Sequence, residues 1–185
     1  ILLAGGTIVL HRDFDASEIW RVIEEERCTV VLGVPTIWKL LADATEFDTA
    51  ELGHVRWFIS GGAPMPRHLV EVYRERGIVM RQGYGLTETS PVISVNPLEN
   101  NDPSSVGCLL EDVEARIGDN DELLTRSPGV MLGYWGNEKA TREIIDPQGW
   151  LHTGDKARIE NNQIYITGRL KEINVLANVE KVPPA

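Results

Sequence analysis

The sequence "VRWFISGGAPMPRHLVEVYRERGIVMRQ", residues 55–82, holds the pattern that decides the fold. It begins with a β-branched and aromatic run that predicts a strand, and it turns at "GGAPMP". A helical segment then ends at Gly77, and the apolar run "IVMRQ" follows as the next strand. A strand, a helix and a second strand in this order predict parallel strands joined by a helix.

The residues before this stretch repeat the alternation. Residues 7–11, "TIVLH", are apolar and β-branched, which predicts a strand. The segment "DASEIWRVIEEER" predicts a helix, with Asp15 as its N-cap and Glu18 in the capping-box position. "CTVVLGV" predicts a buried strand, and Pro35 suits the first turn of a helix in "PTIWKLLADA". We therefore expect an α/β fold, with helices packed on a parallel sheet.

The character of the sequence changes near Asn96. A loop rich in Asn and Pro precedes four short strand-like runs, "DVEARI", "ELLTR", "KARIE" and "QIYIT", and one helix at about 137–145. The turn formers "GDND" and "ENNQ" separate these runs, as in antiparallel hairpins. We expect an α/β subdomain at 1–97, followed by a small antiparallel β-subdomain, sheet or barrel-like, at 98–168.

Composition excludes several classes of protein. Of 185 residues, 42% are hydrophobic and 25% charged, as in ordinary globular proteins. The net charge of −10 disfavours binding to nucleic acids or to anionic membrane surfaces. No apolar run approaches the roughly 18 residues of a membrane-spanning helix. Cys28 and Cys108 lack metal-ligand spacing, so we expect two buried free thiols in a reducing cytoplasm.

Two glycine-rich segments, "SGGAPMP" and "GYGLTETS", follow successive predicted strands. Ligands gather at the carboxyl ends of parallel strands, so these segments could share one crevice. Gly61 and Gly62 would let the backbone approach a flat ligand. The ring of Tyr84 could cover that ligand, a contact of about 0.5–1.5 kcal/mol. Thr87 offers a hydroxyl group to a phosphate, and Glu88 offers a carboxylate oxygen to Mg²⁺.

Two later segments, "GWLHTGDKARI" and "ITGRLKEI", add charged groups. The carboxylate of Asp155 has two oxygens that can accept hydrogen bonds from the vicinal hydroxyls of a ribose. Arg169 and Lys171 lie just past a strand, where an arginine can donate charge-assisted bonds of about 1.5–3 kcal/mol to ribose or phosphate oxygens. Taken alone, each of the four segments also fits a turn with no functional role.

Together, four motifs in this order resemble the adenylate-forming enzymes: "GGAPMP", "YGLTETSP", "GWLHTGD" and "GRLKEINVL". That superfamily includes acyl-CoA synthetases, nonribosomal peptide adenylation domains and firefly-type luciferases. The resemblance covers nearly the whole chain, including "GVPTIWKLL" and "SPGVMLGYW". The ending "VEKVPP" and the lysine of "GRLK" most resemble the fatty acyl-CoA synthetase branch.

The resemblance implies a reaction in two steps. A fatty acid carboxylate reacts with MgATP to give acyl-AMP and pyrophosphate, and the thiol of CoA then displaces AMP. By the same resemblance, Gly61, Gly62 and Ala63 would flank the adenine and the acyl tunnel. Gly83 and Tyr84 would border the substrate and the adenine.

The remaining motif residues also take roles from the resemblance. Thr87 would contact phosphate, and Glu88 would hold Mg²⁺; these two are the candidate catalytic residues. Asp155 would bind the ribose hydroxyls, and Arg169 would bind ribose or phosphate. Lys171 matches a hinge about which a smaller C-terminal domain swings between the two half-reactions.

The resemblance further implies that the chain is a fragment. Residues 169–185 would be the hinge and the start of the C-terminal domain, and the family's phosphate loop would precede residue 1. We therefore expect the chain alone to be inactive and its parent to lie in the cytoplasm, with peripheral membrane attachment left open. Asp121 and Val179 stand where relatives usually show Gly, and "GCLLEDVE" lacks the usual Pro-Gly.

Several alternatives stay open at this point. The parent could be another adenylating enzyme, with an aryl acid or an amino acid as its substrate. It could also be a non-catalytic domain that binds a nucleotide, or a plain α/β domain whose glycine turns are structural. The sequence does not indicate the chain length of the acid.

Overall fold

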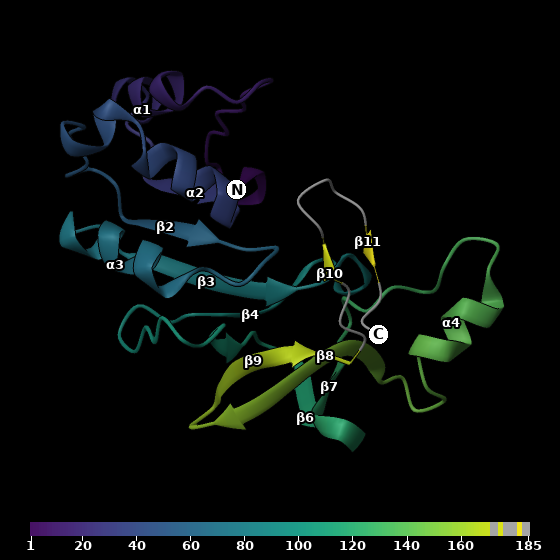
Figure 1. Cartoon of the computed structure of the whole chain (residues 1–185). Helices are drawn as coiled ribbons and strands as arrows, with labels where there is room; N and C mark the ends of the chain where they lie inside the picture. The colour runs from purple at the N-terminus through teal and green to yellow at the C-terminus, as the bar shows by residue number, and fades with distance from the viewer. Residues whose placement is uncertain (171–173, 176–180, 183–185) are drawn as a thin grey trace. The chain divides into compact units, whose positions relative to one another are not determined.

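The computed structural model describes residues 1–170, 174–175 and 181–182. The chain divides into two compact units, Ile1–Arg81 and Gln82–Ala185. Figure 1 draws the helices and strands of both units, and each unit is described by itself. The subdomain boundaries expected from the sequence stay a prediction.

The first unit alternates helices and strands as the sequence predicts. The two strands β1 and β2 pair in parallel, from Val30 opposite Trp57 to Gly33 opposite Ser60. In chain order, its elements are η1 (Leu2–Ala4), α1 (Ala16–Glu25), β1 (Val30–Gly33), α2 (Pro35–Ala42), η2 (Thr45–Asp48), β2 (Trp57–Ser60), α3 (Arg67–Glu75) and the start of β3 (Met80–Gly85).

The predicted helix ends of this unit are confirmed. The carboxylate of Asp15 accepts a hydrogen bond from the backbone N–H of Glu18 at 2.8 Å, which caps α1. Pro35 occupies the first turn of α2, where a missing N–H costs nothing. Gly77 follows α3 with φ 73°, a left-handed conformation that glycine adopts without strain.

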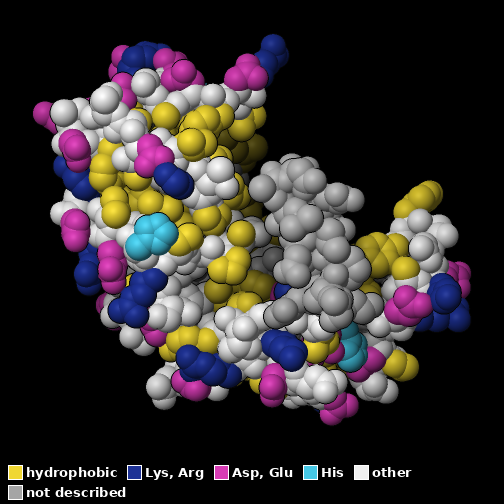
Figure 2. Space-filling model, in the orientation of Figure 1, with side chains coloured by type: hydrophobic (Ala, Val, Ile, Leu, Met, Phe, Trp, Pro, Cys, Tyr) yellow, Lys and Arg dark blue, Asp and Glu magenta, His cyan; other side chains and the backbone are white. Residues whose placement is uncertain are grey.

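Two expectations for this unit are wrong. Residues 7–11 form no strand, and the side chain of Leu10 is 88% exposed. A β-branched run becomes a strand only where a neighbouring strand pairs with its backbone, and no described strand does so here. β1 is a strand, but among the described strands it pairs with β2 alone, and it is not buried, since Leu32 is 73% exposed. Figure 2 shows apolar side chains gathered over the part of this unit that holds α1 and α2.

An aromatic core holds the three helices on β2. The rings of Trp38 and Phe58 stack with centroids 5.1 Å apart, and Tyr73 meets Phe58 edge-on at 5.8 Å. The Tyr73 hydroxyl donates a hydrogen bond to the carbonyl of Trp38 at 2.7 Å, and burial raises the pKa of this phenol. Trp20 and Phe47 complete the cluster.

The second unit is built from antiparallel strands, as predicted. After β3 come η3 (Thr87–Thr89), β4 (Val92–Val95), β5 (Cys108–Leu109), β6 (Glu114–Ile117), η4 (Asp119–Asp121), β7 (Glu122–Arg126), α4 (Glu138–Ile144), β8 (Leu151–Glu160), β9 (Gln163–Arg169), β10 (Asn174–Val175) and β11 (Lys181–Val182). Strands β3, β4 and β5 pair in that order, and so do β6, β7, β8 and β9. Strands β4 and β5 were not predicted from the sequence.

A small apolar core joins these strands. Ile93, Leu123, Ala157 and Ile164 come from β4, β7, β8 and β9, and all are at most 3% exposed. The backbone N–H of Ile164 donates to the carbonyl of Gly107 at 2.9 Å, which ties β9 to the loop before β5. The core therefore fixes the positions of β8 and β9 relative to β3 and β4.

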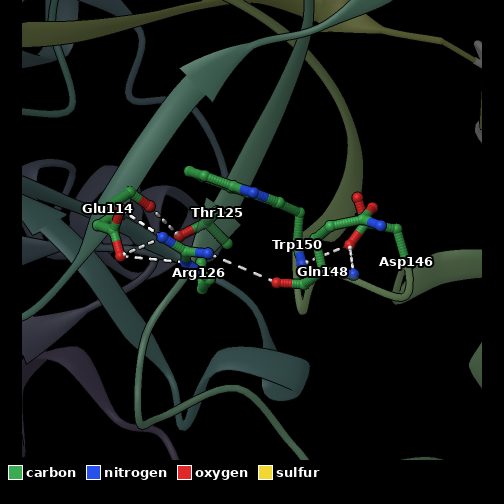
Figure 3. A network of polar contacts seen from close by, with 6 residues as sticks. All are labelled: Glu114, Thr125, Arg126, Asp146, Gln148 and Trp150. Atoms are coloured by element: carbon green, nitrogen blue, oxygen red, sulfur yellow. Dashed lines mark hydrogen bonds and ion pairs between the residues drawn. The ribbon is translucent and has the colours of Figure 1, made fainter.

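A polar network supports the start of β8 (Figure 3). Arg126 of β7 pairs with the carboxylate of Glu114 at 2.8 Å, and its guanidinium lies 4.7 Å from the ring centre of Trp150. The backbone N–H groups of Gln148 and Trp150 donate to the carboxylate of Asp146 at 2.9 and 2.8 Å. The carboxylate of Asp146 therefore stabilises the turn that leads into β8.

Two further observations concern the class of the protein. Both cysteines are free thiols, as expected, although each is half-buried rather than buried. Among the described residues, no helix combines the length and the apolar character needed to cross a membrane.

Candidate functional site

Two residues predicted from separate motifs, Tyr84 and Arg169, both donate hydrogen bonds to the carboxylate of Asp155, which was predicted from a third motif. The hydroxyl of Tyr84, on β3, donates a hydrogen bond to Oδ2 of Asp155 at 2.6 Å. Nε of Arg169 donates to Oδ1 of the same carboxylate at 2.7 Å, and the two residues face each other across β8 and β9. The Asp155 side chain is 9% exposed and that of Arg169 is 58% exposed. The arrangement is thus a buried anion with a cation that reaches into solvent.

A bulge in β8 places Asp155 at this point. Glu122 of β7 pairs with Lys156 and Leu124 pairs with His152, so β8 has two more residues than β7 over this stretch. Gly154, with φ 72°, allows the left-handed turn that the bulge requires.

Side chains hold the bulge in shape. Oε1 of Glu122 accepts a hydrogen bond from the backbone N–H of Gly154 at 3.0 Å, and Oε2 lies 2.8 Å from Nδ1 of His152. The hydroxyl of Thr153 donates to the carbonyl of Leu123 at 2.8 Å and accepts from the N–H of Asp155 at 3.1 Å. The residues of "HTGD" other than the aspartate therefore serve to position it.

The charges of the cluster are well defined. Burial, followed by the hydrogen bond to Asp155, raises the pKa of the Tyr84 phenol, so this hydroxyl stays a neutral donor. The hydrogen bond to Asp155 also raises the pKa of Arg169, which stays a cation. The negative charge of Glu88 contributes to the same shift, so Glu88 and Arg169 interact electrostatically.

The cluster retains capacity to bind a ligand. A carboxylate oxygen has two acceptor positions, and the hydrogen bonds from described residues use one on each oxygen of Asp155. The Nη groups of Arg169 donate to none of the described residues. The contacts among the described residues therefore leave hydrogen-bonding capacity for hydroxyl groups on Asp155 and for an anionic oxygen on Arg169.

Glu88 and Thr87 lie on the short turn η3, which follows β3. Thr89 closes this turn, because its hydroxyl accepts from the N–H of Leu86 at 3.0 Å and donates to the carbonyl of Pro91 at 2.6 Å. Thr89 is buried and structural, whereas Thr87 is exposed and Glu88 is half-exposed. The turn therefore presents the two candidate catalytic residues.

The carboxylate of Glu88 fits a hard cation. Its Oε1 accepts a hydrogen bond from the hydroxyl of Tyr134 at 2.7 Å, and Oε2 accepts none from the described residues. Within the described part of the chain, no cluster of three or more His, Cys, Asp or Glu residues could hold a metal ion. Mg²⁺ commonly takes one or two carboxylates and completes its coordination with phosphate oxygens and water.

The glycines of the motifs have different roles. Gly85 is required by the fold, since a Cβ atom there would lie 1.8 Å from the carbonyl oxygen of Pro91. Gly83 lies on β3 opposite Val95, beside Tyr84 in the same strand. Gly61 and Gly62 follow β2 in the first unit.

Three predicted site residues of the first unit, Gly61, Gly62 and Ala63, keep their roles as predictions. The N–H of Gly61 donates to the carbonyl of Gly33 at 3.2 Å, which continues the pairing of β1 and β2. Gly62 has φ 80°, so it needs to be glycine for conformational reasons alone. Lys171 lies outside the described residues.

Sequence reasoning missed three residues next to the site: Tyr134, Glu122 and His152. Tyr134 stands in "SPGVMLGYW", which was quoted for the resemblance without a role for any single residue. It contacts Glu88 from 46 positions away in the sequence, and no spacing rule reaches that far. Likewise, nothing in the sequence indicates that Glu122 lies beside the bulge in β8.

Comparisons with known proteins show the family to which the chain is similar. A family model described as "AMP-binding enzyme" matches residues 1–135. Feruloyl-CoA synthase from an Amycolatopsis species is 34% identical over 197 residues, which cover 100% of this chain and 40% of that protein. The long-chain-fatty-acid–CoA ligase FadD13 of Mycobacterium tuberculosis is 32% identical over 195 residues, which cover 99% of this chain and 38% of the relative.

A solved structure supports the fold. The ATP-bound MatB of Rhodopseudomonas palustris superposes with a TM-score of 0.86 at 28% identity, covering 99% of this chain and 38% of that one. The expected α/β fold with an antiparallel β-portion is thereby confirmed. The chain spans about two fifths of the length of these proteins.

Proposed function

Because the chain belongs to the AMP-binding enzyme family, we propose that the whole protein joins a carboxylic acid to CoA at the expense of ATP. In the first step, a carboxylate oxygen of the acid bonds to the α-phosphorus of ATP, and pyrophosphate leaves. In the second step, the sulfur of CoA attacks the acyl carbon, the thiol proton is lost, and AMP leaves. The products are acyl-CoA, AMP and pyrophosphate.

The convergence of Tyr84, Arg169 and Asp155 is the observation that carries this proposal. Asp155 accepts hydrogen bonds from the 2′- and 3′-hydroxyls of the ribose through the acceptor positions that the described residues leave open. Arg169 offers its Nη groups to a ribose or phosphate oxygen. The ring of Tyr84, fixed by its hydroxyl, covers the adenine side of the nucleotide.

The turn η3 takes the phosphate end of the nucleotide. The exposed hydroxyl of Thr87 donates to a phosphate oxygen, and the carboxylate of Glu88 would hold Mg²⁺. When bound, the ion neutralises charge on the phosphate oxygens as the bond to pyrophosphate breaks.

The roles proposed for the other motif residues rest on the motifs themselves. By the resemblance of "GGAPMP" to the family, Gly61, Gly62 and Ala63 are proposed to border the adenine and the acyl group, and Gly83 lies next to Tyr84 in β3. Lys171 is the proposed hinge for a second domain of the whole protein.

The acid is proposed to be a fatty acid. The ending "VEKVPP" and the similarity to FadD13 support this choice. An aromatic acid is the second candidate, favoured by a slightly higher identity to feruloyl-CoA synthase, 34% against 32%. Both candidates share the ATP and CoA chemistry, so the proposed site applies to either.

A pyrophosphate-release screen of the whole protein tests the function and the acid together. Saturated fatty acids of increasing length and hydroxycinnamic acids are offered with ATP, Mg²⁺ and CoA. We expect release with fatty acids, and at least a hundredfold lower kcat for Glu88→Ala, on the order of the loss of one preorganised charge stabiliser. If only hydroxycinnamic acids cause pyrophosphate release, the substrate is an aryl acid and the fatty acid proposal is wrong. No release with either class, from a protein that still binds ATP, would favour a non-catalytic nucleotide-binding domain.

A further inference from the structure

The loop between β7 and α4, residues 127–137, is docked on the turn that carries Glu88. The backbone N–H of Met131 donates a hydrogen bond to the carbonyl of Glu88 at 2.8 Å. At Gly129, a Cβ atom would lie 2.8 Å from the carbonyl oxygen of Thr89, so only glycine permits this approach. These backbone contacts hold the loop against η3 without using any hydroxyl group of the loop.

Tyr134 of this loop has its backbone fixed by α4. Its N–H donates to the hydroxyl oxygen of Thr141 at 2.9 Å, and that hydroxyl donates to the carbonyl of Asn137 at 3.0 Å. The N–H of Asn137 donates in turn to the carbonyl of Tyr134 at 3.1 Å. Gly133 packs directly on Thr141, where a Cβ atom would lie 2.8 Å from Cγ2. The base of the tyrosine side chain is therefore held on a helix.

The far end of Tyr134 meets the carboxylate of Glu88. Its hydroxyl donates to Oε1 at 2.7 Å, although Tyr134 as a residue is 39% exposed. A glutamate side chain has several rotatable bonds, and it loses that freedom when it binds a ligand. A hydrogen bond to one carboxylate oxygen restricts the side chain before the ligand binds, so less conformational entropy is lost on binding, and the other oxygen stays available.

We propose that Tyr134 is a positioning residue that holds the Glu88 carboxylate ready for the cation of a metal–nucleotide complex. The proposal rests on the function proposed above, in which Glu88 is the ligand for Mg²⁺. Tyr134 touches neither the nucleotide nor the reacting atoms; it acts only through Glu88.

The test is Tyr134→Phe in the whole protein, because this change removes one oxygen and keeps the ring. Calorimetry measures the affinity for ATP with Mg²⁺ and with EDTA, and pyrophosphate release is followed as the Mg²⁺ concentration varies. We expect affinity for MgATP to fall roughly two- to tenfold, the range of a single net hydrogen bond. The Mg²⁺ concentration for half-maximal rate rises by a similar factor, and the affinity for ATP in EDTA is unchanged.

Tyr165→Phe is the matched control. The Tyr165 hydroxyl donates to Oδ2 of Asp102 at 2.9 Å, the same kind of bond in the same unit but to a carboxylate other than Glu88. Its Mg²⁺ dependence should equal that of the wild type. In a Glu88→Gln background, Tyr134→Phe should add no further change, since its effect passes through the carboxylate.

If the Tyr134→Phe protein does not fold, Thr141→Val provides a second test of the proposal. It removes the hydroxyl that holds the backbone of Tyr134, and it should raise the half-saturating Mg²⁺ concentration in the same direction by a smaller factor. An unchanged Mg²⁺ dependence in a folded Tyr134→Phe protein, or a lower kcat at unchanged half-saturation, would overturn the proposal. If the wild type binds MgATP but releases no pyrophosphate, the proposed function fails, while the calorimetric comparison still decides the role of Tyr134.

Discussion

At the scale of single residues, two aspartates occupy the left-handed region of the backbone. Asp112 has φ 61° and Asp121 has φ 62°. The second stands where relatives of the resembled family usually show glycine, and the first lies in "GCLLEDVE", which lacks the usual Pro-Gly. Both aspartates thus adopt a conformation that favours glycine. Aspartate tolerates this region better than most residues, but it remains strained there.

Asp121→Gly should stabilise the protein. Glycine removes the clash of the Cβ atom at positive φ, and we expect the free energy of unfolding to rise by about 0.5–1 kcal/mol. Asp119→Gly in the same short element is the control, because Asp119 has no positive φ and gains nothing from glycine. Urea denaturation of both variants measures the difference. An equal or lower stability for Asp121→Gly would show that the aspartate is unstrained.

The residue scale also shows what a sequence can predict about a site. Tyr84, Asp155 and Arg169 were identified because each stands in a motif with its own chemistry, and the structure brings them together. Tyr134 and Glu122 were missed because their roles come from contacts across 46 and 32 positions. Such contacts depend on tertiary packing, which leaves no periodic pattern in the sequence.

At the scale of secondary structure elements, the bulge in β8 is the feature on which the site depends. Its two extra residues point Asp155 at Tyr84 and Arg169, and a regular strand would give a different register. The carboxylate of Glu122 stabilises the bulge through the N–H of Gly154 and the ring of His152.

Glu122→Ala should weaken both the fold and the site. The change leaves the N–H of Gly154 without its partner, so we expect a loss of about 1–3 kcal/mol in the free energy of unfolding. Glu138→Ala on α4 is the control, because Glu138 makes an exposed ion pair with Arg142 that contributes little. Thermal and urea denaturation distinguish the two variants. Equal stability for both would show that the bulge does not need Glu122.

The elements that were predicted correctly are those with local signals. The helix ends depend on contacts within a few residues, so the sequence alone predicts them, as at Asp15, Pro35 and Gly77. Residues 7–11 were wrongly expected to form a strand, because a β-branched run says nothing about whether a partner strand is present. β4 was missed, since its four residues follow directly after a glycine-rich motif.

At the scale of the whole molecule, a chain with a net charge of −10 belongs to a family that binds an anionic nucleotide. The proposed site would resolve this conflict locally, since Arg169 would supply a cation and Glu88 would offer a ligand to a second one. The α/β class and the antiparallel second unit followed from alternating patterns along the chain. The family followed from the order of four motifs, none of which was specific by itself.

The most direct measurement compares the binding of ATP and of 2′,3′-dideoxy-ATP to the whole protein, in the wild type and in Asp155→Asn. If Asp155 binds the ribose, the wild type should prefer ATP by roughly tenfold or more, the range of hydrogen bonds to a charged group. The same preference should be largely lost in Asp155→Asn. A preference of equal size in both proteins would contradict the account, because the ribose would then be recognised somewhere other than the carboxylate where Tyr84 and Arg169 meet.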